Sequence, residues 1–162
     1  MTGQETQLCW CHVRGGGHVA TKVRRNKKRI AKSPICWFGG KHYKAPLIVG
    51  LLPSHERYIE PFFGGGSVFF AKEPCPHETV SDIDHGLVNF FRVLRDNTDE
   101  LLRLVELTPN SRELWDECNA QWAGESDPLR KAWMWWVVAR QSFSGRFGSA
   151  WHSTVTEASG GM

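Results

Sequence analysis

The spacing of apolar residues changes several times along the first half of this chain, and each change predicts an element. Apolar positions recur at helical spacing over residues 45–52, between two prolines, and predict a helix. A short strand pattern over residues 57–60 is followed by three glycines at 64–66 and an apolar run over 67–72, which predicts a strand, a tight turn and a short helix. Residues 78–84 predict a second strand. The alternation of strands and helices is typical of an α/β fold.

The second half of the chain keeps a helical period almost throughout. Short polar residues that precede the apolar runs predict the helix starts: Asp84, Asn97 with Glu100, Asn110 with Glu113, and Asp127 with Pro128. The last helix, from Leu129 to about Gln141, carries three tryptophans. We interpret them as part of an aromatic core or interface rather than as a base-stacking platform, because helical Trp more often packs than lies exposed.

The glycine turn is the first candidate for chemistry. Glycine tolerates positive φ and lets a backbone lie against a ligand, and we expect the amides that open the following helix to be free to bond it. Glu60 and Pro61 end the strand before the turn, where open α/β sheets place their ligands. Asp82 ends the next strand, the position of an acid that accepts hydrogen bonds from ribose hydroxyls. The glycine pair at 39–40, with Lys41 after it, suits an adenosine-like ligand.

Composition and charge limit the function classes. The 162 residues suffice for one domain, and the net charge of +3 divides unevenly, with +9 through Lys44 and −6 beyond it. The five cysteines are scattered, no secretory segment opens the chain, and no apolar run approaches the roughly 18 residues of a membrane span. We therefore expect a reduced, cytoplasmic protein that does not enter a membrane.

Residues 1–33 differ from the rest of the chain. They are polar and densely basic, and we expect a disordered extension, with a basic arm that binds phosphates as the sharper alternative. Cysteines and histidines also gather here, at Cys9, Cys11, His12 and His18. Their spacing lacks the paired pattern of structural zinc sites, so we expect no metal.

Four motifs in order resemble the Dam-type, phage-common class of adenine-specific DNA methyltransferases. The resemblance covers about residues 35–148. Its motifs are Trp37-Phe38-Gly39-Gly40-Lys41, Tyr58-Ile59-Glu60-Pro61-Phe62-Phe63-Gly64-Gly65-Gly66, Ser81-Asp82-Ile83-Asp84 with Leu87 and Asn89, and Arg140-Gln141-Ser142-Phe143-Ser144-Gly145. A nicotinamide-type dinucleotide domain fits less well, because the glycines lack the G-x-G-x-x-G spacing.

The resemblance implies a Rossmann-like, AdoMet-dependent methyltransferase fold with S-adenosyl-L-methionine as cofactor and double-stranded DNA as partner. The residues that it places around the cofactor are Trp37, Lys41, Glu60, Pro61, Phe62, Phe63, Gly64, Gly66 and Asp82. It assigns residues 34–97 to the cofactor-binding part, 98–139 to the start of a helical target-recognition insertion, and 140–162 to a loop and tail. In that loop Arg140, Phe143 and Arg146 are the expected DNA contacts.

One motif of the resembled family does not occur in the 162 residues. The family's catalytic element, Asp-Pro-Pro-Tyr, is absent, and Asp127-Pro128-Leu129-Arg130 reads as a helix start. The sequence also predicts only two strands. We therefore expect an N-terminal part of a methyltransferase with an incomplete sheet and exposed apolar surface, inactive alone and completed by a second polypeptide. The alternative is a non-catalytic AdoMet- or DNA-binding remnant.

Overall fold

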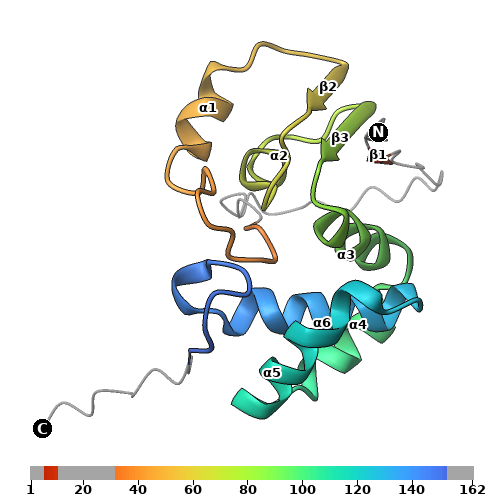
Figure 1. Cartoon of the computed structure of the whole chain (residues 1–162). Helices are drawn as coiled ribbons and strands as arrows, with labels where there is room; N and C mark the ends of the chain where they lie inside the picture. The colour runs from red at the N-terminus through yellow and green to blue at the C-terminus, as the bar shows by residue number, and fades with distance from the viewer. Residues whose placement is uncertain (1–5, 11–31, 153–162) are drawn as a thin grey trace, which may run out of the picture. The chain divides into compact units, whose positions relative to one another are not determined.

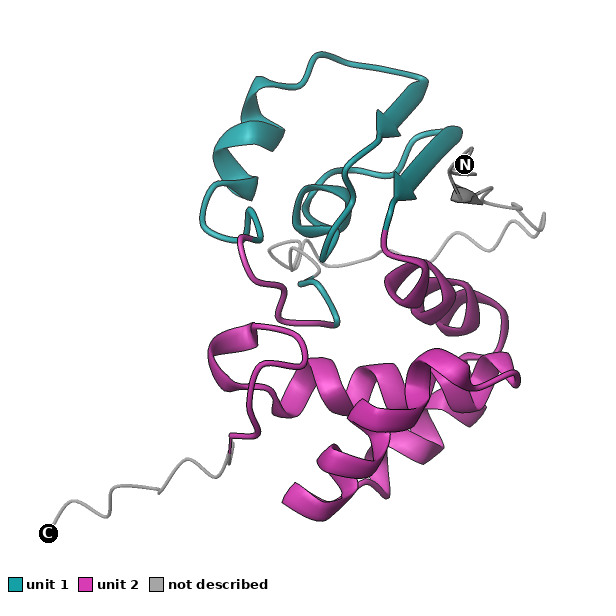
Figure 2. Cartoon of the chain, viewed as in Figure 1, with its two compact units in different colours: residues 1–34, 40–83 teal, residues 35–39, 84–162 magenta. Residues whose placement is uncertain are grey.

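The computed structural model describes residues 6–10 and 32–152 (Figure 1). The chain divides into two compact units, residues 1–34 with 40–83 and residues 35–39 with 84–162 (Figure 2). Strands and two short helices make up the described part of the first unit, and the second is helical. The fold thus mixes helices and strands, and its boundary at residue 83 falls inside the predicted cofactor-binding part, 34–97.

The first unit is built on a small sheet with the strand order β1-β3-β2. Strands β2 (Arg57–Glu60) and β3 (His77–Asp82) run parallel, as consecutive strands joined by a crossover helix do. Strand β1 (Thr6–Trp10) pairs with β3 in the antiparallel direction. Both predicted strands are confirmed, although β3 begins and ends earlier than the predicted 78–84.

Strand β1 corrects one expectation from composition. It lies inside residues 1–33, which the basic character of the segment predicts to be disordered. The open edge of β3 offers backbone donors and acceptors to any extended segment, and residues 6–10 carry no charge that would oppose the pairing. Residues 11–31, with the basic run and with Cys11, His12 and His18, lie outside the described residues.

Two helices complete the first unit. Helix α1 (Ala45–Leu51) and helix α2 (Ser67–Ala71) confirm the predicted helices to within one residue, and they contact one another. The core of this unit includes Phe63, Val68, Phe69 and Val80, whose side chains are all less than a tenth exposed. Large apolar side chains also remain at the surface, among them Leu51 at 76%, Ile59 at 62% and Ile83 at 85% exposed, in line with the expected exposed apolar surface.

The described part of the second unit contains four helices and two short 3₁₀ turns. They are α3 (His85–Asp96), α4 (Thr98–Glu106), α5 (Arg112–Gln121), η1 (Trp122–Gly124), α6 (Pro128–Gln141) and η2 (Phe143–Gly145). Two predicted caps are confirmed: Asp84 accepts a hydrogen bond from the Leu87 amide at 2.9 Å, and Asp127 accepts one from the Arg130 amide at 2.7 Å.

At the two other predicted helix starts the capping needs correction, although α4 begins directly after Asn97 as predicted. Asn97 precedes α4, but its side chain donates to the Glu100 carboxylate at 3.0 Å and makes no hydrogen bond to the helix backbone. Helix α5 is capped by Ser111, which accepts from the Leu114 amide at 3.4 Å, rather than by Asn110. Ser111 has the extended backbone that an N-cap needs, with φ −142° and ψ 129°.

The tryptophans of α6 pack in or against the core, as predicted: Trp135 is buried, and Trp133 and Trp136 are partly buried. Trp135 is fully buried, and its ring lies 5.6 Å from Trp37, 5.4 Å from Phe90 and 5.3 Å from Phe147. Trp37 therefore belongs to the second unit. In the described part of the chain, no helix has both the length and the apolar character to cross a membrane.

Candidate functional site

The glycine turn between β2 and α2 is fastened to the end of β3. The Gly64 amide donates to Asp82 Oδ2 at 2.7 Å, and the Phe63 amide donates to the Ser81 carbonyl oxygen at 3.0 Å. The Ser81 hydroxyl donates to the Pro61 carbonyl oxygen at 3.1 Å. These bonds bring the turn and Asp82 together at the carboxyl end of the two parallel strands, where the sequence predicts a ligand.

Gly66 is required by packing inside the protein. Gly64 and Gly66 have positive φ, 51° and 69°, as the turn demands. A Cβ atom on Gly66 would lie 2.5 Å from the ring of Phe63, which is only 3% exposed. The Gly66 amide donates to the Phe63 carbonyl oxygen at 2.9 Å. The sequence predicts that the glycines let a ligand approach the backbone, whereas at Gly66 the close neighbour is an aromatic side chain.

Glu60 places a buried carboxylate beside this turn. Its side chain is 10% exposed and accepts a hydrogen bond from the Tyr58 hydroxyl at 2.9 Å. Burial raises the pKa of the Glu60 carboxyl, while the Tyr58 hydrogen bond and the charge of Lys41 act in the opposite direction. Lys41 Nζ lies 3.7 Å from Glu60 Oε1 and donates to the Phe62 carbonyl oxygen at 3.5 Å. The ammonium group thus lies between the Glu60 carboxylate and the backbone of the turn.

The structure separates the nine predicted cofactor residues into three groups. Most of them lie around the turn in the first unit: Lys41, Glu60, Pro61, Phe62, Gly64, Gly66 and Asp82. Phe63 belongs to the core of that unit, so only its backbone is part of the turn. Trp37 lies in the second unit and stacks on Trp135.

Of the predicted DNA contacts, Phe143 and Arg146 lie on the loop after α6, whereas Arg140 lies in the last turn of α6 and not in the loop where the sequence predicts it. Arg140 is exposed, Phe143 is 56% exposed, and the Arg146 guanidinium lies 5.0 Å from the ring centroid of Phe38. A cavity of about 360 Å³ opens beside them within the second unit. It is lined by Cys36, Trp37, Phe38, Ala139, Arg140, Ser142, Ser144, Gly145 and His152. The first and last of the four resembling motifs therefore meet at this cavity.

Two buried residues of the fourth motif, to which the sequence assigns no individual role, hold this loop in place. Gln141 Oε1 accepts from the Ser111 amide at 3.2 Å, and Gln141 Nε2 donates to the Pro109 carbonyl oxygen at 3.1 Å. The Ser142 hydroxyl accepts from Trp115 Nε1 at 3.2 Å and donates to the Val138 carbonyl oxygen at 2.6 Å. The sequence does carry a signal for these two residues, because polar side chains that directly follow the apolar run of a helix often anchor the next loop.

Comparisons with known proteins agree with the order of these motifs. The model of the D12 class N6 adenine-specific DNA methyltransferases matches residues 37–146. A type II methyltransferase of Lactococcus lactis subsp. cremoris is 37% identical over 89 residues, which are 54% of this chain and 30% of that protein. The DNA N-6-adenine-methyltransferase of Escherichia phage P1 is 29% identical over 95 residues, 59% of this chain and 12% of its own length.

A third relative covers more of the chain. The DNA adenine methylase of Escherichia coli is 27% identical over 113 residues, 67% of this chain and 40% of that protein. The chain thus spans less than half the length of these curated relatives. Because the family model matches well over half of the 162 residues, the chain belongs to the D12 class of N6 adenine-specific DNA methyltransferases.

Proposed function

We propose that this chain provides the S-adenosyl-L-methionine-binding part of a methyltransferase that modifies the exocyclic amino group of adenine in double-stranded DNA. Family membership supports the reaction class. The observation that carries the cofactor assignment is the hydrogen bond from the Gly64 amide to Asp82, which joins the glycine turn to the acid at the end of the next strand. Glu60 adds a second carboxylate at the same edge of the sheet.

The chemistry of these residues fits the proposed cofactor. S-adenosyl-L-methionine offers an ammonium group and ribose hydroxyls as donors, and carboxylates accept up to about four hydrogen bonds each. Asp82 and Glu60 provide such acceptors, and exposed Phe62 provides an apolar surface beside them. When bound, the cofactor supplies a methyl group on a positively charged sulfur. The chain's own residues would hold the cofactor in place, with the two carboxylates favouring its positive charge.

We also propose roles for the parts of the chain outside the glycine turn. The parallel pair β2 and β3, joined by α2, supports a Rossmann-like fold. Residues 98–139 would begin the target-recognition insertion. Arg140, Phe143 and Arg146 would contact DNA, because they place two cations and an exposed aromatic ring at the end of α6 and on the loop that follows it. Trp37 would take part through the second unit.

The methyl-transfer step requires acceptors for the adenine amino group. In the family that the chain resembles, an Asp-Pro-Pro-Tyr element supplies these acceptors, together with an aromatic ring that stacks on the extruded base. This sequence does not occur in the 162 residues, so we propose that a part of the enzyme outside these residues supplies the element. The same observation favours the alternative function, a non-catalytic AdoMet- or DNA-binding remnant.

Calorimetry with S-adenosyl-L-methionine tests the cofactor assignment. Asp82→Asn keeps an oxygen that can accept from the Gly64 amide but removes the charge, and we expect the cofactor affinity to fall about tenfold or more. Asp116→Asn, on the exposed surface of α5, is the matched control and should bind as the wild-type chain does. A wild-type chain that binds no cofactor would refute the assignment.

Transfer of a tritiated methyl group into double-stranded DNA tests the reaction. We expect no transfer by this chain alone, and transfer when the C-terminal part of a relative such as the Escherichia coli enzyme is added. Activity of the chain alone would show that the proposed division of the active site is wrong. Cofactor binding without transfer in either mixture would favour the remnant.

A further inference from the structure

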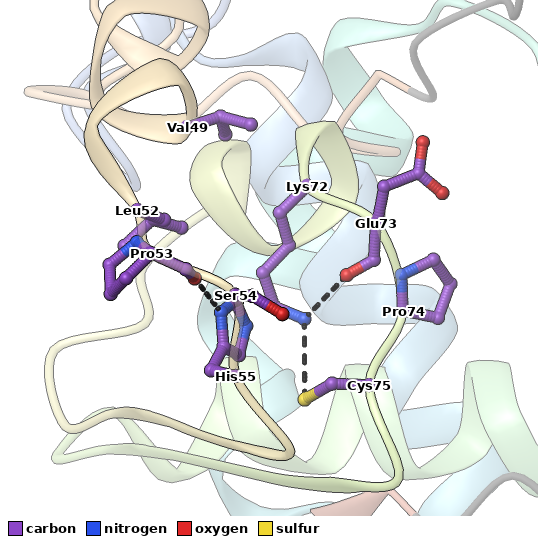
Figure 3. A pocket seen from close by; sticks show the side chains of 9 residues that line it. All are labelled: Val49, Leu52, Pro53, Ser54, His55, Lys72, Glu73, Pro74 and Cys75. Atoms are coloured by element: carbon purple, nitrogen blue, oxygen red, sulfur yellow. Dashed lines mark hydrogen bonds between the residues drawn. The ribbon is translucent and has the colours of Figure 1, made fainter.

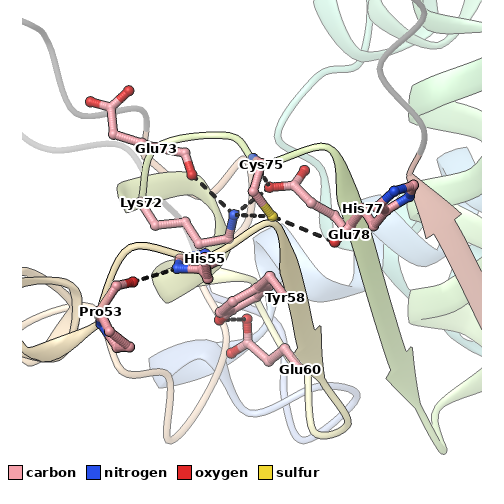
Figure 4. Close-up of polar contacts among 9 residues, drawn as sticks. All are labelled: Pro53, His55, Tyr58, Glu60, Lys72, Glu73, Cys75, His77 and Glu78. Carbon is pink, nitrogen blue, oxygen red and sulfur yellow. Dashed lines mark hydrogen bonds and ion pairs between the residues drawn. The ribbon is translucent and has the colours of Figure 1, made fainter.

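Tyr58 and Glu60 form a pair inside β2. They are two positions apart in a strand, so their side chains lie on the same face. The Tyr58 hydroxyl donates to Glu60 Oε2 at 2.9 Å (Figure 4). Burial raises the pKa of the Tyr58 phenol, with the charge of Glu60 as the next cause, so the hydroxyl remains a donor at neutral pH.

The ring of Tyr58 is held on several sides. Lys72 Nζ lies 4.4 Å from its centroid, a cation–π contact. The rings of His55 and Phe69 lie at centroid distances of 5.9 Å and 6.4 Å. The hydroxyl therefore has a restricted position, and the hydrogen bond to Glu60 is set by the packing of the ring.

All hydrogen-bond donors of the Lys72 ammonium group are used inside the protein. Its side chain is 1% exposed and forms an ion pair with Glu78, which is 4% exposed. The same ammonium group donates to the Glu73 carbonyl oxygen at 3.1 Å and lies 3.9 Å from Cys75 Sγ (Figure 3). These three partners use its three N–H donors. Lys72 therefore has no donor left for a ligand in the cavity of about 380 Å³ beside it, and its ammonium group contacts the Tyr58 ring.

We infer that Tyr58 is a positioning residue for Glu60: its hydroxyl fixes Oε2 and turns Oε1 toward Lys41 and the glycine turn. The inference rests on the proposed function only in naming the cofactor as the ligand of Glu60. Among the described residues, those with a charge or a donor that face Glu60 are Lys41 at 3.7 Å, the Tyr58 hydroxyl, and more weakly Lys72. Of these, only Tyr58 makes a short hydrogen bond to the carboxylate.

The test is Tyr58→Phe, which removes the hydroxyl and keeps the ring on Lys72. The matched control is Tyr43→Phe, because Tyr43 is 93% exposed. The first readout is the titration of the Glu60 side-chain carboxyl by NMR with ¹³C-labelled glutamate, with the resonance assigned by its loss in Glu60→Gln. The second is the affinity for S-adenosyl-L-methionine as a function of pH.

We expect the Glu60 titration to move to higher pH in Tyr58→Phe and to stay in place in Tyr43→Phe. The cofactor affinity at neutral pH should fall about tenfold, and its loss on acidification should begin at higher pH. An unmoved titration would overturn the inference, as would a Tyr58→Phe chain without the folded far-UV spectrum, since the hydroxyl would then hold the fold. A moved titration in a chain that binds no cofactor would uphold the role of Tyr58 and refute the proposed function.

Discussion

Gly66→Ala is the sharpest test of how the glycine turn is built. The new Cβ would lie 2.5 Å and 2.9 Å from two atoms of the Phe63 ring and 2.9 Å from Phe70, closer than packed atoms approach. Phe63 cannot easily move aside, because it is 3% exposed and packs edge-to-face on Phe69 at 5.5 Å. Overpacking of this kind costs about 1–3 kcal/mol.

The backbone of Gly66 adds a second cost. Its φ of 69° lies in the left-handed region, where a residue with a side chain loses about 1–2 kcal/mol. The two costs together predict that Gly66→Ala destabilises the first unit by about 2–5 kcal/mol. Gly50→Ala is the matched control, because Gly50 lies in α1 with no atom within 4 Å of its Cβ position, and alanine there should stabilise the helix by up to about 1 kcal/mol.

Hydrogen exchange followed by mass spectrometry measures this difference in the right part of the chain. Seven of the eight tryptophans lie in the second unit, so tryptophan fluorescence would report mainly on that unit. Peptides covering β2 and β3 should lose protection by about 30-fold or more in Gly66→Ala and none in Gly50→Ala. Equal protection in both variants would refute the reasoning, because it would mean that the Phe63 ring gives way at no cost.

Two further predictions concern the second unit, and both are measured by urea unfolding followed by tryptophan fluorescence. Gly86→Ala would place a Cβ 2.4 Å from fully buried Trp135, and we expect a net loss of up to about 2 kcal/mol after the gain in helix propensity. A midpoint that rises by the full propensity gain would show that the ring can shift at no cost. Asp127→Ala removes the cap of α6 and should cost about 1 kcal/mol. Asp116→Ala is its control, and an equal loss there would argue against the cap.

Local signals in the sequence predict most of the elements. The Asp127-Pro128 start of α6 and the Asp84 start of α3 are correct, because a cap residue and the following apolar period carry the information within a few residues. The start of α5 is displaced from Asn110 to Ser111, since both residues are good caps and the backbone geometry decides between them.

Long-range pairing is what the sequence does not reveal. Strand β1 forms by pairing with β3, some seventy residues later, and its composition gives no sign of that partner. Phe63 is predicted at the cofactor because it stands in the glycine motif, but its side chain packs into the core. Tyr58 could have been found, because residues two apart in a strand share a face and a tyrosine can donate to a glutamate there.

The glycine turn is held by the protein itself, and this bears on how it would bind a cofactor. Hydrogen bonds from Gly64 to Asp82, from Phe63 to Ser81 and from Ser81 to Pro61 fix the turn on β3. A binding loop whose conformation is already fixed loses little entropy when a ligand arrives. The same reasoning applies to Glu60. Its carboxylate is buried, which disfavours the charged form, and it accepts a hydrogen bond from the Tyr58 hydroxyl that orients it. Affinity in this site would therefore depend on the residues that hold the turn as much as on those that touch the ligand.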